Sequence, residues 1–181
     1  MTKGWIVALM AVLLSFYLGG CVSPSSGLLP YSDVRDGYRL LYPNGWVQKT
    51  VQGGADLLFH DIIQPMENLS VVIGELKSVQ NLADLGTPED VGARVRDRII
   101  APPESDRRAT LISASAEQFN NQDYYWLEYA IELPNGVKRH DLVSVTANRQ
   151  RLYTLDISAP ESRWEKVKEM FSQVVHSFRV Q

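Results

Sequence analysis

Four strand-like runs between residues 109 and 158 constrain the fold of this chain more than any other feature. They read "ATLISASAEQF", "YYWLEYAIEL", "KRHDLVSVTA" and "RLYTLDIS". The connectors between them, "NNQD", "PNG" and "ANRQ", have the length and composition of β-hairpin turns. Consecutive strands joined by such turns pair with their neighbours, so we expect a four-stranded antiparallel meander.

One segment before the meander and one after it have helical patterns. The earlier one, "TPEDVGARVRDRII", begins with Thr87 as N-cap and Pro88 in the first turn. The later one covers residues 160–177 and carries apolar residues at the spacing of one helix face. These residues are Trp164, Val167, Phe171, Val174, Val175 and Phe178. Together with three strand-like runs at the start, "GYRLLYP", "ADLLFHDII" and "LSVVIGEL", the pattern predicts an α+β fold, one antiparallel sheet covered by helices.

The N-terminal segment has the form of a secretory signal. Lys3 precedes an apolar run over residues 5–18, which is too short for a comfortable transmembrane helix. The run ends in Leu18-Gly19-Gly20-Cys21, which resembles a bacterial lipoprotein cleavage box. We therefore expect a lipoprotein signal peptide at 1–20, a lipid anchor such as palmitate on Cys21, a tether at 21–37 and a domain at 38–181. An ordinary signal peptide with a coincidental cysteine and an uncleaved anchor are the alternatives.

Cysteine content and charge exclude several functional classes. Cys21 is the only cysteine, so the domain has no disulfide, no zinc finger and no thiol nucleophile. The formal net charge is −3, which argues against a nucleic-acid partner because such proteins usually present a basic face.

The histidines do not form a catalytic motif. His60 and His140 each precede an aspartate within a predicted strand, where neighbouring side chains point to opposite faces, so each needs a partner from elsewhere in the fold. His176 lies at a helix end, where a cation complements the helix dipole. The chain contains no G-x-S-x-G, H-E-x-x-H or Walker motif. The aromatic run "YYWLEY" favours a central strand covered on both faces, with a ligand-binding surface as the alternative. Because the catalytic motifs are missing, we expect no enzyme.

Several segments resemble the PsbP family of photosystem II extrinsic proteins. They are "GYRLLYPNGW", "HDII", "TPEDVG" and "RHDLVSVTANRQRLYTLDISAPESRWEKVKEMFSQVVHSFRV", and the resemblance runs from about Tyr38 to Val180. Combined with the lipoprotein box, the chain is similar to the cyanobacterial members. The resemblance implies an α-β-α sandwich around a central antiparallel sheet. It also implies a place on the lumenal side of the thylakoid membrane and a photosystem II partner.

The resemblance further implies a metal site. In plant members a histidine before one strand and an aspartate before a helix have been associated with metal binding. The matching positions here are His140 and Glu161, so the acid is one methylene longer. Zinc or manganese would suit these ligands, although two ligands need completion by water or a neighbouring molecule. The alternative for Glu161 is a capping box with Ser158 at the start of the last helix.

These features predict a non-enzymatic thylakoid lipoprotein with a monomeric domain. It would bind photosystem II core subunits and assembly factors during assembly or repair, because confinement on the membrane raises its effective concentration near membrane subunits. One alternative is a stable extrinsic subunit of the oxygen-evolving complex that helps to retain calcium. The others are a manganese- or zinc-handling lumenal protein and a cell-envelope lipoprotein without a photosynthetic role.

Overall fold

A seven-stranded antiparallel sheet dominates the computed structural model, which describes residues 27–77 and 81–181. Its spatial order is β3-β4-β5-β9-β8-β7-β6. The strands are β3 (Trp46–Gln48), β4 (Leu57–Asp61), β5 (Asn68–Glu75), β6 (Arg108–Phe119), β7 (Gln122–Glu132), β8 (Lys138–Asn148) and β9 (Arg151–Pro160). The signal peptide and Cys21 lie outside the described residues.

The predicted meander is confirmed. Strands β6 to β9 pair antiparallel in chain order, and β9 then pairs with β5. Asn120 and Asn121 in the β6–β7 turn have φ values of 48° and 65°. A two-residue turn with φ > 0 at both positions matches the twist of the flanking strands, and asparagine tolerates it better than most residues.

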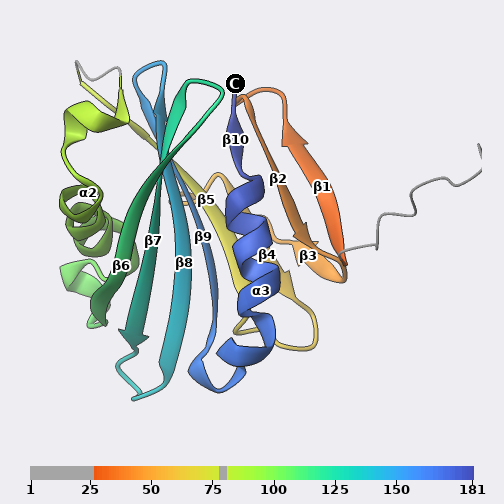
Figure 1. Cartoon of the computed structure of the whole chain (residues 1–181). Helices are drawn as coiled ribbons and strands as arrows, with labels where there is room; N and C mark the ends of the chain where they lie inside the picture. Colours follow the sequence, from red (N-terminus) through yellow and green to blue (C-terminus); the bar gives the residue numbers. More distant parts are fainter. Residues whose placement is uncertain (1–26, 78–80) are drawn as a thin grey trace, which may run out of the picture.

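Helices cover both faces of this sheet, as Figure 1 shows. Helix α3 (Glu161–Ser177) packs on one face, with contacts to β8 and β9. Helix α2 (Pro88–Val95) packs on the other face against β6 and β7, and is accompanied by the short turns η2 (Leu82–Leu85), η3 (Arg96–Ile100) and η4 (Pro103–Ser105). The expected α+β class and α-β-α sandwich are therefore confirmed.

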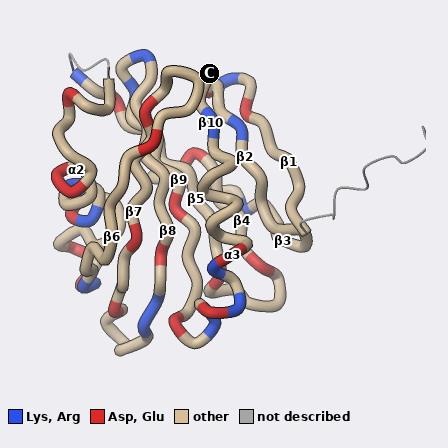
Figure 2. Tube along the Cα trace, viewed as in Figure 1, with Lys and Arg blue, Asp and Glu red and all other residues tan. Residues whose placement is uncertain are grey.

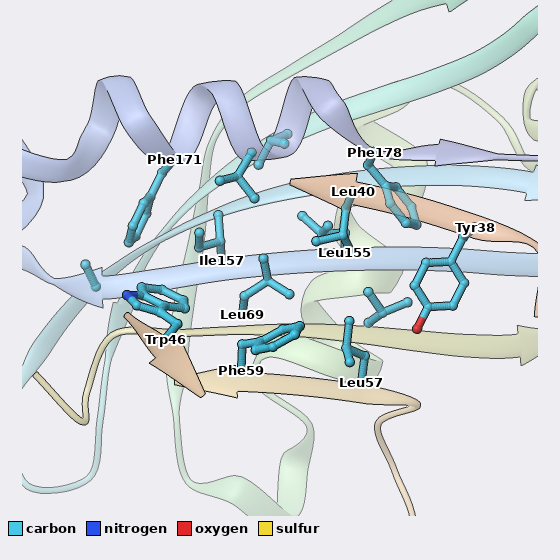
Figure 3. Close-up of a cluster of buried hydrophobic side chains, with 14 of the residues drawn as sticks. Tyr38, Leu40, Trp46, Leu57, Phe59, Leu69, Leu155, Ile157, Phe171 and Phe178 are labelled. Atoms are coloured by element: carbon cyan, nitrogen blue, oxygen red, sulfur yellow. The ribbon is translucent and has the colours of Figure 1, made fainter. Parts of the chain in front are cut away.

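Helix α3 lies over the larger of two apolar cores. Phe171 is fully buried at the centre of its inner face, and its ring meets the edge of Trp46 with centroids 5.9 Å apart. Figure 3 shows Phe171 and Phe178 pointing from this side toward Leu155, Ile157 and the aromatic residues of the first strands. The predicted helical stripe thus faces the core.

Helix α2 closes the second core at a point of close approach. Thr87 caps the helix, and its hydroxyl accepts a hydrogen bond from the Asp90 N–H. A methyl group on Gly92 would lie 2.9 Å from the end of the Leu111 side chain, so a larger residue here would require Leu111 to move. The Tyr129 hydroxyl donates to the Gly92 carbonyl at 2.8 Å. The α-helix ends at Val95 rather than continuing through residue 100, because its last turn widens into η3.

The predicted tether at 21–37 is wrong for the part that the structure describes. Leu28–Asp33 is a strand, β1, which pairs with β2 (Tyr38–Pro43) over six residue pairs. With β10 (Arg179–Val180), these strands form a second sheet in the order β1-β2-β10. The edge of Tyr31 packs on Phe59, with ring centroids 5.6 Å apart, so β1 contributes to the core. The folded unit therefore begins ten residues before the predicted boundary at Tyr38.

Among the residues that the structure describes, no helix combines the length and the apolar character needed to cross a membrane.

Candidate metal centre

His140 occupies a buried position between the sheet and helix α3. It lies in β8, where its strand neighbours are Ala130 of β7 and Ala159 of β9. These two small side chains leave room for the imidazole. The ring stacks on Trp164 of α3, with centroids 4.0 Å apart and an interplanar angle of 9°. Only 7% of the residue is exposed. The stacking fixes the plane of the ring and therefore the direction of both ring nitrogens.

Each nitrogen of this ring faces a carboxylate. Nδ1 of His140 lies 3.0 Å from Oε2 of Glu161, and Nε2 lies 2.6 Å from Oε1 of Glu128. A neutral imidazole has one N–H, so it can donate to only one of these groups. Two chemical states satisfy both contacts. Either the charged ring donates to both acids, or a neutral ring donates to one and directs its lone pair at a cation held by the other.

The geometry also admits the second state, with Glu128 as the orienting acid. Metal-binding histidines usually donate their other N–H to a carboxylate, which fixes the tautomer. If Glu128 accepts from Nε2, the Nδ1 lone pair points toward Glu161. Two ligands of one tetrahedral zinc ion are about 3.4 Å apart, so Nδ1 and Oε2, which lie at the hydrogen-bond distance of 3.0 Å, would separate by a few tenths of an ångström to hold an ion. The Glu161 side chain is half exposed and lines a groove of about 520 Å³, so water can complete the coordination.

The structure brings the two predicted ligands together and rejects the capping alternative. Pro160 is the N-cap of α3, and no side chain caps the helix. The Ser158 hydroxyl points away and donates to Asp141 at 2.5 Å. Glu161, the first residue of the helix, is therefore free to reach His140. The pattern indicated that His140 needed a partner from elsewhere, and Glu128 and Glu161 are these partners.

Sequence reasoning did not identify Glu128. It lies in the aromatic run of β7, two residues from the His140 neighbour Ala130 and on the same face. The available signal was a single acid within the aromatic and apolar run at residues 124–131 of this strand. Recognising it required the register between β7 and β8.

The other two histidines have no carboxylate contact among the described residues. His60 contacts the backbone carbonyl of Asp61 through Nδ1 at 3.1 Å. His176 is exposed, contacts the Ser172 carbonyl at 2.6 Å and lies beside Trp126. Neither forms a second site.

Three aspartates meet at the end of the β1–β2 hairpin. Oxygens of Asp33, Asp36 and Asp56 lie within 4.8 Å of one another. The Tyr38 hydroxyl donates to Asp56 at 2.6 Å, and Arg151 forms an ion pair with Asp36 at 3.1 Å. Arg151 offsets part of the acidic charge, and the Tyr38 hydroxyl satisfies one of the carboxylates. The cluster therefore serves as a polar junction between the two sheets.

A buried acid pair lies on the opposite face of β8 and β9 from His140. Asp141 and Asp156 line a polar cavity of about 120 Å³ together with Arg107, Arg139 and Ser158. Burial raises the pKa of Asp141 to about 6, although Ser158 and the arginines act in the other direction. Burial and the nearby Asp141 raise the pKa of Asp156 well above its usual value. Oδ1 of Asp156 is buried without a hydrogen-bond partner among the described residues.

This pair predicts a protein that is more stable in mild acid. Because the pKa values of Asp141 and Asp156 are raised in the folded state, this pair binds more protons in the folded protein than in the unfolded chain between pH 4 and 7. We expect the free energy of unfolding to rise by roughly 1 kcal/mol per pH unit as the pH falls from 7 to 5. Denaturant titrations at several pH values measure this slope. The Asp156→Asn variant should flatten it and be more stable at pH 7, whereas an unchanged slope in this variant would contradict the assignment.

Comparison with known proteins gives three results. Residues 26–180 match the sequence profile of the PsbP family. The chain is 48% identical to CyanoP of Thermosynechococcus vestitus, over 90% of this chain and 91% of that protein. It is 46% identical to CyanoP of Synechocystis sp., over 96% and 95% of the two chains. The solution structure of the Synechocystis protein superposes with a TM-score of 0.74 at 46% identity, covering 91% of this chain and 99% of that chain. The similarity extends over nearly the whole chain.

Proposed function

The chain belongs to the PsbP family, and on this premise we propose that it is a lipid-anchored protein of the thylakoid lumen that binds photosystem II subunits during assembly or repair. The observation that carries the proposal is 46–48% identity to two CyanoP proteins over almost their full length. Such similarity supports a shared role rather than a shared fold alone. The lipoprotein box at Cys21 supports the membrane attachment.

We propose binding and release as the mechanism, without catalysis. The domain would occupy a lumenal surface of a core subunit until later extrinsic proteins arrive. Strand β1 begins seven residues after Cys21, so the anchor would hold the folded domain close to the lipid. A domain confined in this way meets membrane subunits at a high effective concentration. A modest intrinsic affinity is then sufficient for binding, and it permits release.

Crosslinking in intact membranes, followed by purification of a C-terminally tagged protein, tests the proposal. The Gln181 N–H donates to the Gly37 carbonyl, so the C-terminus lies beside the β1–β2 turn. A tag attached there is far from the start of β1. We expect enrichment of photosystem II core subunits together with assembly factors. Recovery of mature complexes with a full extrinsic set would instead identify a stable extrinsic subunit. Recovery of neither would reject the photosystem role and leave a cell-envelope lipoprotein with this fold as the working alternative.

Metal handling is the second candidate function. The observation that favours it is the stacked ring of His140 with a carboxylate at each nitrogen. In this hypothesis Glu161 and Nδ1 of His140 would bind zinc or manganese, and Glu128 would hold the ring in the correct tautomer. A half-exposed ligand would allow rapid exchange of the ion, as delivery or buffering requires.

A further inference from the structure

The β4–β5 connection presents apolar side chains to solvent. Ile62 is 61% exposed, Ile63 is 82% exposed and Met66 is 37% exposed. Such side chains are usually scattered singly over a protein surface, whereas here they lie within five residues of one loop. Their grouping needs a physical reason.

Specific polar contacts hold this loop in place. The carboxylate of Asp61 accepts hydrogen bonds from the Ile63 N–H at 2.6 Å and the Gln64 N–H at 2.9 Å. These bonds lower the pKa of Asp61 against the opposing effect of burial. At the other end of the loop, the buried carboxylate of Glu67 forms an ion pair with Arg163 of α3. The fold therefore fixes the loop with its isoleucines outward.

The loop lies at the end of the molecule where the described chain begins. Leu28 pairs with Pro43, and the Asn44 N–H donates to the Gly27 carbonyl at 2.7 Å. Trp46, which follows in β3, pairs with Asp61 immediately before the loop. The start of β1, the β2–β3 turn and the β4–β5 loop thus form one continuous end, the lower right of Figure 1.

The segments that form this end carry no charged residue, and the nearest charged groups, Asp61 and the Glu67–Arg163 ion pair, lie at its margin. Residues 27–32, 40–48 and 62–66 contain no acidic or basic residue. Figure 2 shows the resulting tan region at the start of β1 and around the β2–β3 turn. Five of the eight exposed large apolar residues that the structure describes lie in these segments: Leu29, Val47, Ile62, Ile63 and Met66. A surface without charge can enter a lipid interface without the cost of dehydrating an ion.

The position of Cys21 identifies the occupant of this surface. Five residues lie between Cys21 and Gly27, and the six steps from one Cα to the next span at most about 22 Å when fully extended. A lipid on Cys21 therefore keeps the uncharged end within reach of the bilayer. We propose that Ile62 and Ile63 insert into the lipid interface and fix the orientation of the domain on the membrane. This inference rests on the anchored location proposed above.

A fluorescent probe on the loop tests the insertion. Lipidation blocks the thiol of Cys21, so an Ile63→Cys variant of the full lipidated protein can be labelled at one position with a nitrobenzoxadiazole group. Val34→Cys is the matched control, because Val34 is 91% exposed in the turn at the opposite end of β1. Both proteins are reconstituted into phosphatidylcholine–phosphatidylglycerol vesicles with nitroxide-labelled acyl chains. We expect loss of most of the fluorescence at position 63 and no loss at position 34.

Flotation of the same vesicles separates failure of the anchor from failure of the insertion. Protein that floats but shows equal quenching at the two positions would overturn the insertion and leave the anchor intact. If the probe at position 63 is not quenched in lipid vesicles and is protected only in native membranes, the surface binds a protein partner instead. This result would also overturn the insertion. Protein that does not float would reject the anchor, and the insertion with it.

Discussion

Replacing Cys21 by serine is expected to abolish incorporation of labelled palmitate into the protein. Acylation at a lipoprotein box would need the thiol of this residue, and Cys21 is the only cysteine in the chain. The loss should be complete rather than partial, because no other side chain of the chain supplies a thiol. Metabolic labelling followed by purification of the tagged protein measures it.

A second variant tests the lipoprotein box itself. The double variant Cys21→Ser, Ser25→Cys keeps one thiol but moves it four residues further from the glycine pair. We expect this protein to remain unlabelled. Absence of label in the unmodified protein would identify an ordinary signal peptide or an uncleaved anchor. Labelling of the double variant would show that the position of the thiol does not matter.

Replacing His140 by alanine is expected to remove zinc and manganese binding from the candidate centre. The substitution deletes the ligand nitrogen and the ring that Glu128 and Glu161 contact. Calorimetric titration of the full protein should show that the affinity falls by more than about 100-fold. The Glu128→Gln variant retains both proposed ligands and should lose about 10–100-fold, as observed for groups that orient a ligand.

His60→Ala is the matched control for the metal experiment. His60 also precedes an aspartate within a strand, but its ring contacts a backbone carbonyl and no carboxylate of residues 27–77 and 81–181. Metal binding should therefore be unchanged in this variant. Equal affinities in the His140→Ala variant and the unmodified protein would eliminate the centre. Loss of binding on Asp36→Asn instead would transfer the site to the aspartates at the β1–β2 hairpin.

The repeating patterns in the sequence predicted the β6–β9 meander of the large sheet and the final helix. Apolar and polar residues alternate along the strands β6 to β9, and short turns connect them. Both signals extend over only a few residues, so they can be recognised without knowing the rest of the fold. The apolar stripe of helix α3, which ends at Phe178, can be recognised from neighbouring turns of one helix in the same way. The small sheet was not predictable from such signals, because β10 pairs with β2 across almost the whole length of the domain. Strand β1 was missed because Pro30 and Ser32 made its segment resemble a linker.

The candidate site was predicted only in part for a related reason. His140 and Glu161 were selected from the family resemblance, and the structure places them in contact. Glu128 depends on the register between β7 and β8, which one sequence does not reveal. The acid pair Asp141 and Asp156 depends likewise on the pairing of β8 with β9 and on the burial of both side chains by the segment around Arg107.

The pairing of β1 with β2 has a consequence for any shortened form of this protein. A fragment that began at Tyr38, the boundary suggested by the sequence, would lack β1 and leave one side of β2 without a partner. The same deletion would remove Tyr31 from the ring of Phe59 and expose an aromatic surface beside the bare strand. An open strand edge next to apolar side chains is a template for pairing with another chain. Such a fragment would tend to self-associate, and the resulting oligomers would reflect the missing strand rather than a property of the natural protein.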